Sequence, residues 1–149
     1  MQLSQKESEL LKDLKDQEKL CIEKYTKHSS CAKDPQLKNL FSSLAAGEQQ
    51  HLAALDALGE GTVQSPFTAG ASSQTFSASY TNDCPDKQSD CYLCSDLLTS
   101  EKHSSHLYDT CIFEFKDKNT RDLLGSIQKQ EQGHGKAIYD YMAANAMYG

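Results

Sequence analysis

Six ionisable residues of this 149-residue chain form two copies of one pattern, 83 positions apart. Each copy holds a glutamate and, thirty residues later, a Glu-x-x-His motif. The residues are Glu18, Glu48, His51, Glu101, Glu131 and His134. Mixed carboxylate and imidazole ligands suit iron and manganese, and zinc would also bind them. The repeat therefore predicts a metal centre to which both halves of the chain contribute.

A tyrosine accompanies the first glutamate of each copy, seven residues further on. These residues are Tyr25 and Tyr108. A tyrosine on an apolar helical stripe is most often a plain core aromatic. Here the hydroxyl groups could also donate hydrogen bonds to the chelating carboxylates, which would orient them.

The spacing of apolar residues predicts four helices to position these groups. We expect them over residues 4–30, 35–58, 89–116 and 119–145. Capping signals mark their starts: Ser4 with Glu7, Asp34 with Pro35, then Ser89 or Asp90, and Asn119. In each helix the ionisable residues continue the apolar stripe, so they should point into the interior.

Residues 60–87 differ from the rest because they are rich in Thr, Ser, Gly and Ala. We interpret them as a long, largely irregular crossover between the second and third helices. The prediction is an all-α single domain over residues 1–149, folded as a four-helix bundle. Such bundles accept one long crossover connection.

Charge balance favours two metal ions over one. Burying a single unpaired carboxylate costs several kcal/mol, and four together would repel one another. Two divalent cations supply four positive charges and remove that cost. We therefore expect two ions per chain, with iron or manganese preferred over zinc.

The cysteines form a second group of reactive residues. Cys91 and Cys94 form a Cys-x-x-Cys pair near the expected start of the third helix, where the helix dipole would lower a thiol pKa. With Cys84 they could act as redox or cross-linking thiols, or remain unremarkable thiols. Cys21 and Cys111 lie on core stripes and should be buried.

The composition excludes several function classes. A formal net charge of −6 gives no reason to expect a nucleic-acid partner, and no apolar run is long enough to span a membrane. The first residues lack the apolar stretch of a secretory signal, so we expect synthesis in the cytoplasm. Aromatic residues scattered through the crossover suggest self-association, as a dimer or larger homo-oligomer.

The second half resembles the coat F domain of bacterial spore coat proteins. The resemblance is carried by residues 96–102, 108–114, Glu131 to His134, 139–142 and 147–148. The ligand pattern as a whole is similar to that of the ferritin-like superfamily, in its rubrerythrin-type arrangement. The fold implied is a ferritin-like bundle, and the implied location is the spore coat, with other coat proteins as partners.

The resemblance also implies a role for each ligand. Glu18 and Glu101 would be terminal chelating ligands, Glu48 and Glu131 would bridge the two ions, and each histidine would cap one ion. Rubrerythrins carry a further glutamate where this chain has Ser104. Two functions stay open: a structural coat protein, and a dimetal oxidoreductase acting on O₂ or peroxide.

Overall fold

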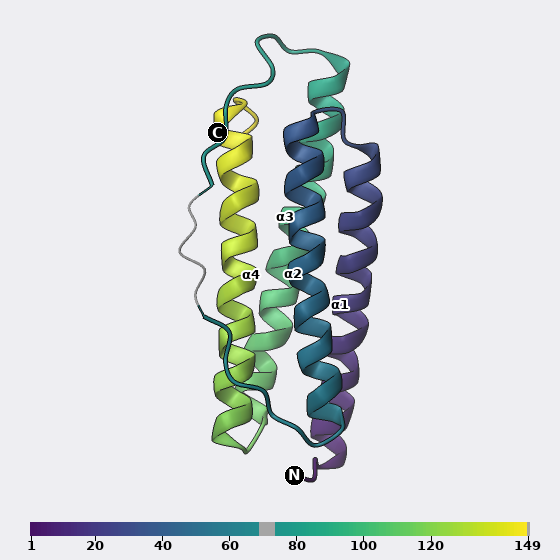
Figure 1. Ribbon diagram of the computed structural model, residues 1–149, viewed down its shortest axis with the longest axis vertical. Helices are drawn as coiled ribbons and strands as arrows, with labels where there is room; N and C mark the ends of the chain where they lie inside the picture. The colour runs from purple at the N-terminus through teal and green to yellow at the C-terminus, as the bar shows by residue number, and fades with distance from the viewer. Residues whose placement is uncertain (69–73, 149) are drawn as a thin grey trace.

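The computed structural model describes residues 1–68 and 74–148, which contain four helices and no strand. The helices are α1 (Gln5–Cys31), α2 (Pro35–Gly59), α3 (Pro85–Glu114) and α4 (Lys118–Ala144). They lie side by side, with α1 packed along α2 and α3 along α4 (Figure 1). Within the described ranges, no helix is long and apolar enough to cross a membrane.

Two of the predicted helix starts are confirmed. The Ser4 hydroxyl accepts a hydrogen bond from the Glu7 backbone N–H, and the Glu7 carboxylate accepts one from Ser4, which completes a capping box. Asp34 caps α2 through the Gln36 backbone N–H, with Pro35 at the first helical position. Local sequence alone sets both starts.

The predicted start of α3 is wrong. The helix begins four residues earlier than expected, at Pro85, with Cys84 as its N-cap residue. Proline at the first helical position is the same signal that marks α2. Asp90 is buried in the second turn, and its carboxylate accepts hydrogen bonds from the backbone N–H groups of Lys33 and Asp34. Asp90 thus stabilises the turn between α1 and α2.

Small differences occur at other helix ends. Asp117, two residues before the predicted Asn119, caps α4 by accepting hydrogen bonds from Thr120. Helix α3 ends at Glu114, and the following Phe115 is fully buried. These shifts of one or two residues leave the predicted core faces unchanged.

The described parts of the segment between α2 and α3, residues 60–68 and 74–84, contain no helix or strand. Its described parts contact α4 toward both ends: the Phe67 backbone N–H donates to Ser126, and the backbone N–H groups of Ser79 and Tyr80 donate to Asn145 (Figure 1). Its Phe67 and Phe76 pack against the apolar interior, and the Tyr80 hydroxyl donates to Asp90. The bundle itself therefore partly covers the crossover aromatic residues from which the sequence suggested self-association.

The interior consists of two apolar clusters. One contains Tyr25, Phe41, Leu97 and Tyr141, and lies toward the end where α1 stops. The other contains Leu14, Leu55, Leu124 and Phe115, and lies toward the opposite end. On every helix the predicted metal ligands fall between the residues of these clusters. A polar layer thus divides the apolar core.

Candidate metal centre

All six predicted ligand residues meet in this polar layer. Five are buried, and the His134 side chain is 13% exposed. They form two groups: Glu18, Glu48, His51 and Glu131 in the first, and Glu48, Glu101, Glu131 and His134 in the second. Within each group the ligand atoms lie within 4.8 Å of one another. Glu48 and Glu131 belong to both groups.

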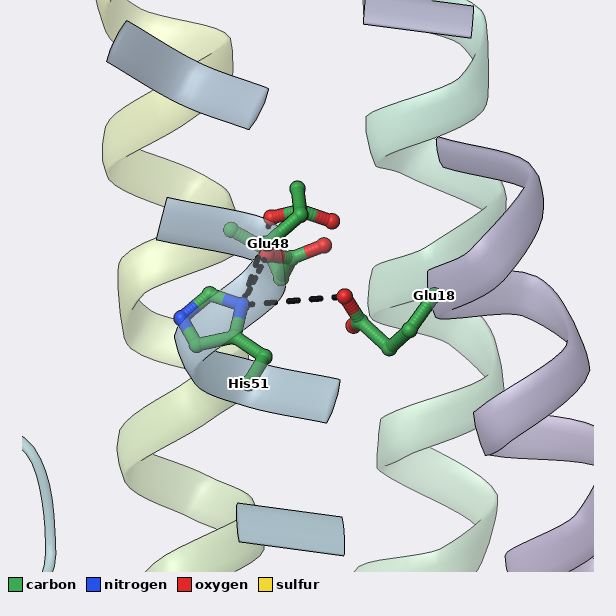
Figure 2. Close-up of side chains that lie close together, drawn as sticks. Glu18, Glu48 and His51 are labelled. Carbon is green, nitrogen blue, oxygen red and sulfur yellow. Dashed lines mark ion pairs between the residues drawn. The ribbon is translucent and has the colours of Figure 1, made fainter. Parts of the chain in front are cut away.

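The two histidines direct the same ring nitrogen toward the carboxylates. Nδ1 of His51 lies 2.9 Å from Glu131 Oε1, 3.2 Å from Glu48 Oε1 and 3.8 Å from Glu18 Oε2 (Figure 2). Nδ1 of His134 lies 2.9 Å from Glu48 Oε1 and 3.6 Å from an oxygen of each of Glu101 and Glu131. The rings are nearly parallel, with centroids 5.7 Å apart.

Each tyrosine binds the glutamate on the other helix, so that Tyr25 holds Glu101 and Tyr108 holds Glu18. The Tyr25 hydroxyl on α1 donates to Glu101 on α3 at 2.6 Å, and the Tyr108 hydroxyl on α3 donates to Glu18 on α1 at 2.7 Å. Burial and the negative carboxylates raise the pKa of both phenols well above the ordinary value, so the hydroxyl groups remain protonated donors. In Glu18 the other oxygen faces His51, whereas in Glu101 the oxygen held by Tyr25 is also the one 3.6 Å from His134 Nδ1.

Eight buried side-chain atoms in the described residues have no hydrogen-bond partner, and all belong to these six residues. They include both oxygens of Glu48, both oxygens of Glu131 and Nδ1 of each histidine. A buried polar atom left without a partner costs about 1–3 kcal/mol. Such atoms are rare in native proteins, so a concentration of them at one point indicates a missing partner.

The cluster strongly perturbs proton binding. Burial and the neighbouring carboxylates raise the pKa of Glu18 and Glu131. Burial also acts to raise the pKa of Glu48, but its close contacts with Glu131 and both histidines outweigh burial and lower that pKa. Close contacts with the negative carboxylates of Glu101 and Glu48 overcome the effect of burial on His134 and raise its pKa to about 10. Without metal, the cluster would therefore hold protons.

Gln130 is a site residue that the sequence prediction missed. Its amide nitrogen donates to the Thr68 carbonyl at 3.2 Å, which turns Oε1 toward Nε2 of His51, 2.6 Å away. Because an amide oxygen only accepts hydrogen bonds, His51 Nε2 carries the proton and Nδ1 presents a lone pair to the cluster. The repeat could not reveal Gln130 because the equivalent residue is Gly47.

The predicted thiols lie outside this cluster. Cys84 and Cys91 are partly buried, Cys94 is fully buried in the apolar core, and all three are free thiols. The expectation of a lowered pKa is wrong for Cys94, because burial raises the pKa of that thiol. Cys21 and Cys111 are buried as predicted, and burial raises the pKa of Cys111 to about 12.

Comparison with known proteins gives one result for the second half of the chain. Residues 89–149 match the family model of the Coat F domain. The match covers most of α3 and all of α4, and includes Glu101, Glu131 and His134. No curated protein and no solved structure gives a significant match to the chain. The other three residues of the cluster come from the unmatched first half.

Proposed function

We propose that this chain is a structural component of the bacterial spore coat, and that its bundle is ferritin-like and holds two divalent metal ions. The Coat F match over residues 89–149 supports the coat assignment. The eight partnerless buried atoms support the metal ions. The order of the helices, with a long connection from α2 to α3 (Figure 1), is that of ferritin-like bundles.

The donor set fits such a pair of ions. Glu48 and Glu131 approach both histidines and would bridge the ions, whereas Glu18 lies near His51 and Glu101 near His134, as terminal ligands would. Four carboxylates match the charge of two divalent cations. Oxygen and imidazole donors favour iron or manganese, and accept zinc. Tyr25 and Tyr108 would hold the terminal carboxylates in place.

Metal analysis tests this proposal. Protein purified without chelator, reconstituted anaerobically with Mn²⁺ or Fe²⁺ and dialysed, should retain close to two ions per chain. The double variant Glu48→Ala, Glu131→Ala should retain almost none, because it removes both bridging ligands. Glu23→Ala, on the exposed face of α1, is the matched control and should bind like the wild type. Equal metal content in the double variant and the wild type would contradict the proposal.

The location requires a separate test. In a spore-forming bacterium that encodes this chain, it should appear during sporulation and be extracted with the coat fraction. Antibody detection in fractionated spores measures this. A protein found only in growing cells would contradict the coat assignment, but would leave the metal site untouched.

Oxidoreductase activity toward O₂ or peroxide is a second candidate, and one observation favours it. A cavity of about 430 Å³ between α3 and α4 is lined by Glu101 and Glu131, so small molecules have space next to the cluster. A purely structural centre needs no such access. Peroxide consumption by iron-loaded protein, compared with the double variant, measures the activity. Equal rates in the two proteins would exclude it.

We also propose association with copies of itself and with other coat proteins. The side chains of Tyr92 and Phe113 on α3 are 72% and 74% exposed. Exposed aromatic side chains are common at protein interfaces. Sedimentation velocity should show a dimer or larger species, and Phe113→Ser should weaken it if this face is used. A strict monomer at high concentration would contradict self-association.

A further inference from the structure

The two halves of the metal centre differ at one pair of positions. Glu48 and Glu131 are equivalent in the repeat, and so are His51 and His134, but the residues just before the glutamates are Gly47 and Gln130. This difference lies directly behind the histidine rings. In both histidines Nδ1 faces the carboxylates, and Nε2 is the outer nitrogen. Gln130 contacts the outer nitrogen of His51, and Gly47 lies behind the outer nitrogen of His134.

His51 is held on its outer side. Its Nε2 donates to Gln130 Oε1 at 2.6 Å, and the edge of Phe67 packs against the ring with centroids 5.2 Å apart. The side chain is completely buried. A hydrogen bond to the outer nitrogen fixes the orientation of a metal-binding imidazole and strengthens it as a ligand.

His134 lacks this support from the equivalent position. A Cβ atom added at Gly47 would lie 3.0 Å from His134 Nε2, so glycine lets the ring pack closely against α2, and a larger residue would push the ring away. His134 and Gly47 line a cavity of about 740 Å³, in which the charged lining residues are Lys129 and Lys136. Lys136 is paired with Asp140, so Lys129 is the remaining cation near this opening.

Two cavities touch the cluster, one between α3 and α4 and the other between α2 and α4. The one lined by Gly47 reaches His134, and the one between α3 and α4 reaches Glu101 and Glu131. Neither is lined by Glu18 or His51. Each of these two cavities thus touches ligand residues of the Glu101–His134 position, and the second is also lined by Gln130.

We infer that the two metal positions are unequal: the Glu18–His51 position holds its ion tightly, and the Glu101–His134 position holds its ion weakly and accepts a small anion as an external ligand. The inference rests on the proposed dimetal centre. The anion is favoured by the cavity next to Glu101 and Glu131 and by Lys129 near His134. Gln130 acts as a positioning residue for the tight position.

Titration of the metal-free protein with Mn²⁺, followed by EPR and calorimetry, tests the unequal affinities. The wild type should bind in two steps with dissociation constants about 10–100-fold apart, the usual effect of a ligand's outer hydrogen bond. Gln130→Ala should weaken the tight step until the two merge. Gln130→Glu, which keeps an acceptor, should restore the separation. The inference would be overturned by two equal binding steps in the wild type, or by equal weakening of both steps in Gln130→Ala. A complete lack of binding would instead refute the dimetal centre.

Azide is the probe for the external ligand. Titration of the iron(III)-loaded protein, followed by its visible absorption, should show one azide per pair of ions. Gly47→Ala should reduce azide affinity, because the added Cβ lies 3.0 Å from Nε2 of His134 and must displace this ligand of the weak position. Gly125→Ala, where an added Cβ meets nothing within 4 Å, is the matched control and gains the same helix propensity. Azide binding that Gly47→Ala leaves unchanged would overturn this part.

Discussion

Replacing Glu48 and Glu131 by glutamine should reverse the effect of metal ions on the stability of this bundle. Eight buried atoms of the cluster lack partners. At about 1–3 kcal/mol each, their total cost of roughly 8–24 kcal/mol is comparable with the whole stability of a typical domain, about 5–15 kcal/mol. The metal-free wild type must reduce this cost by binding protons or water, and part of the penalty remains.

Glutamine keeps the shape of each side chain and removes two buried charges. In the presence of a chelator, the double glutamine variant should therefore be more stable than the wild type, by about 1–4 kcal/mol. With Mn²⁺ at about 100 times the weaker dissociation constant, each bound ion adds about 2.7 kcal/mol or more, so the wild type should gain at least about 5 kcal/mol. The variant should gain little. The order of stability is then opposite in the two conditions.

Urea unfolding followed by circular dichroism, in chelator and in excess Mn²⁺, measures this reversal. Glu23→Gln, at an exposed position paired only with Lys27, should behave like the wild type in both conditions. If the double variant is less stable than the wild type in chelator and still gains stability from Mn²⁺, the reasoning is refuted. The carboxylates would then act as ordinary hydrogen-bonded core groups.

Three further predictions concern residues around the cluster. Tyr25→Phe and Tyr108→Phe each remove a donor to a buried carboxylate, so each should lower metal affinity by about 10–100-fold. The two effects should be similar because the repeat relates the two tyrosines. A Mn²⁺ titration measures them, and unchanged affinity in both variants would contradict the prediction. Hydrogen bonds from the backbone N–H groups of Ser4 and Lys116 lower the pKa of Glu7 below 4.5. The resulting stabilisation should be present above about pH 4.5 and disappear as the pH falls through the folded-state value. Unfolding at pH 3 and pH 6 should thus show a smaller pH dependence in Glu7→Gln, and an identical dependence would argue against this role. Finally, maleimide labelling followed by mass spectrometry should modify Cys84 in the native protein and Cys94 only after unfolding, because Cys94 is fully buried. Labelling of native Cys94 at the same rate would show that this part of the core opens.

The burial of Cys94 removes it from the cysteines that could form cross-links between chains. A thiol in the apolar core cannot reach another chain without local unfolding. Three other cysteines are more accessible: Cys31 is exposed, and Cys84 and Cys91 are partly exposed. They belong to segments near the end of the bundle where α1 ends and α3 begins (Figure 1). If coat assembly uses disulfides, these three residues are the candidates, and Cys94→Ser should leave the cross-links intact.

Local patterns in the sequence determined which helix faces point inward. The stripes that carry Glu18, Glu48, Glu101 and Glu131 are also apolar stripes, and a helix buries one face along its whole length. The repeat then showed that both halves place the same groups at the same level. Ser4 and Asp34 marked helix starts because a cap involves residues only two or three positions away. All of these signals act over short distances along the chain.

The tertiary structure decided the contacts between groups that are distant in sequence. Asp90 looked like a helix cap, but its partners are backbone groups 56 and 57 residues away. Gln130 contacts His51 from 79 residues away, and the repeat gives no sign of it because Gly47 breaks the symmetry. Periodicity tells which face of a helix is buried. Which side chain lies opposite depends on how the helices are packed together, and that arrangement places Gln130 behind one histidine and Gly47 behind the other.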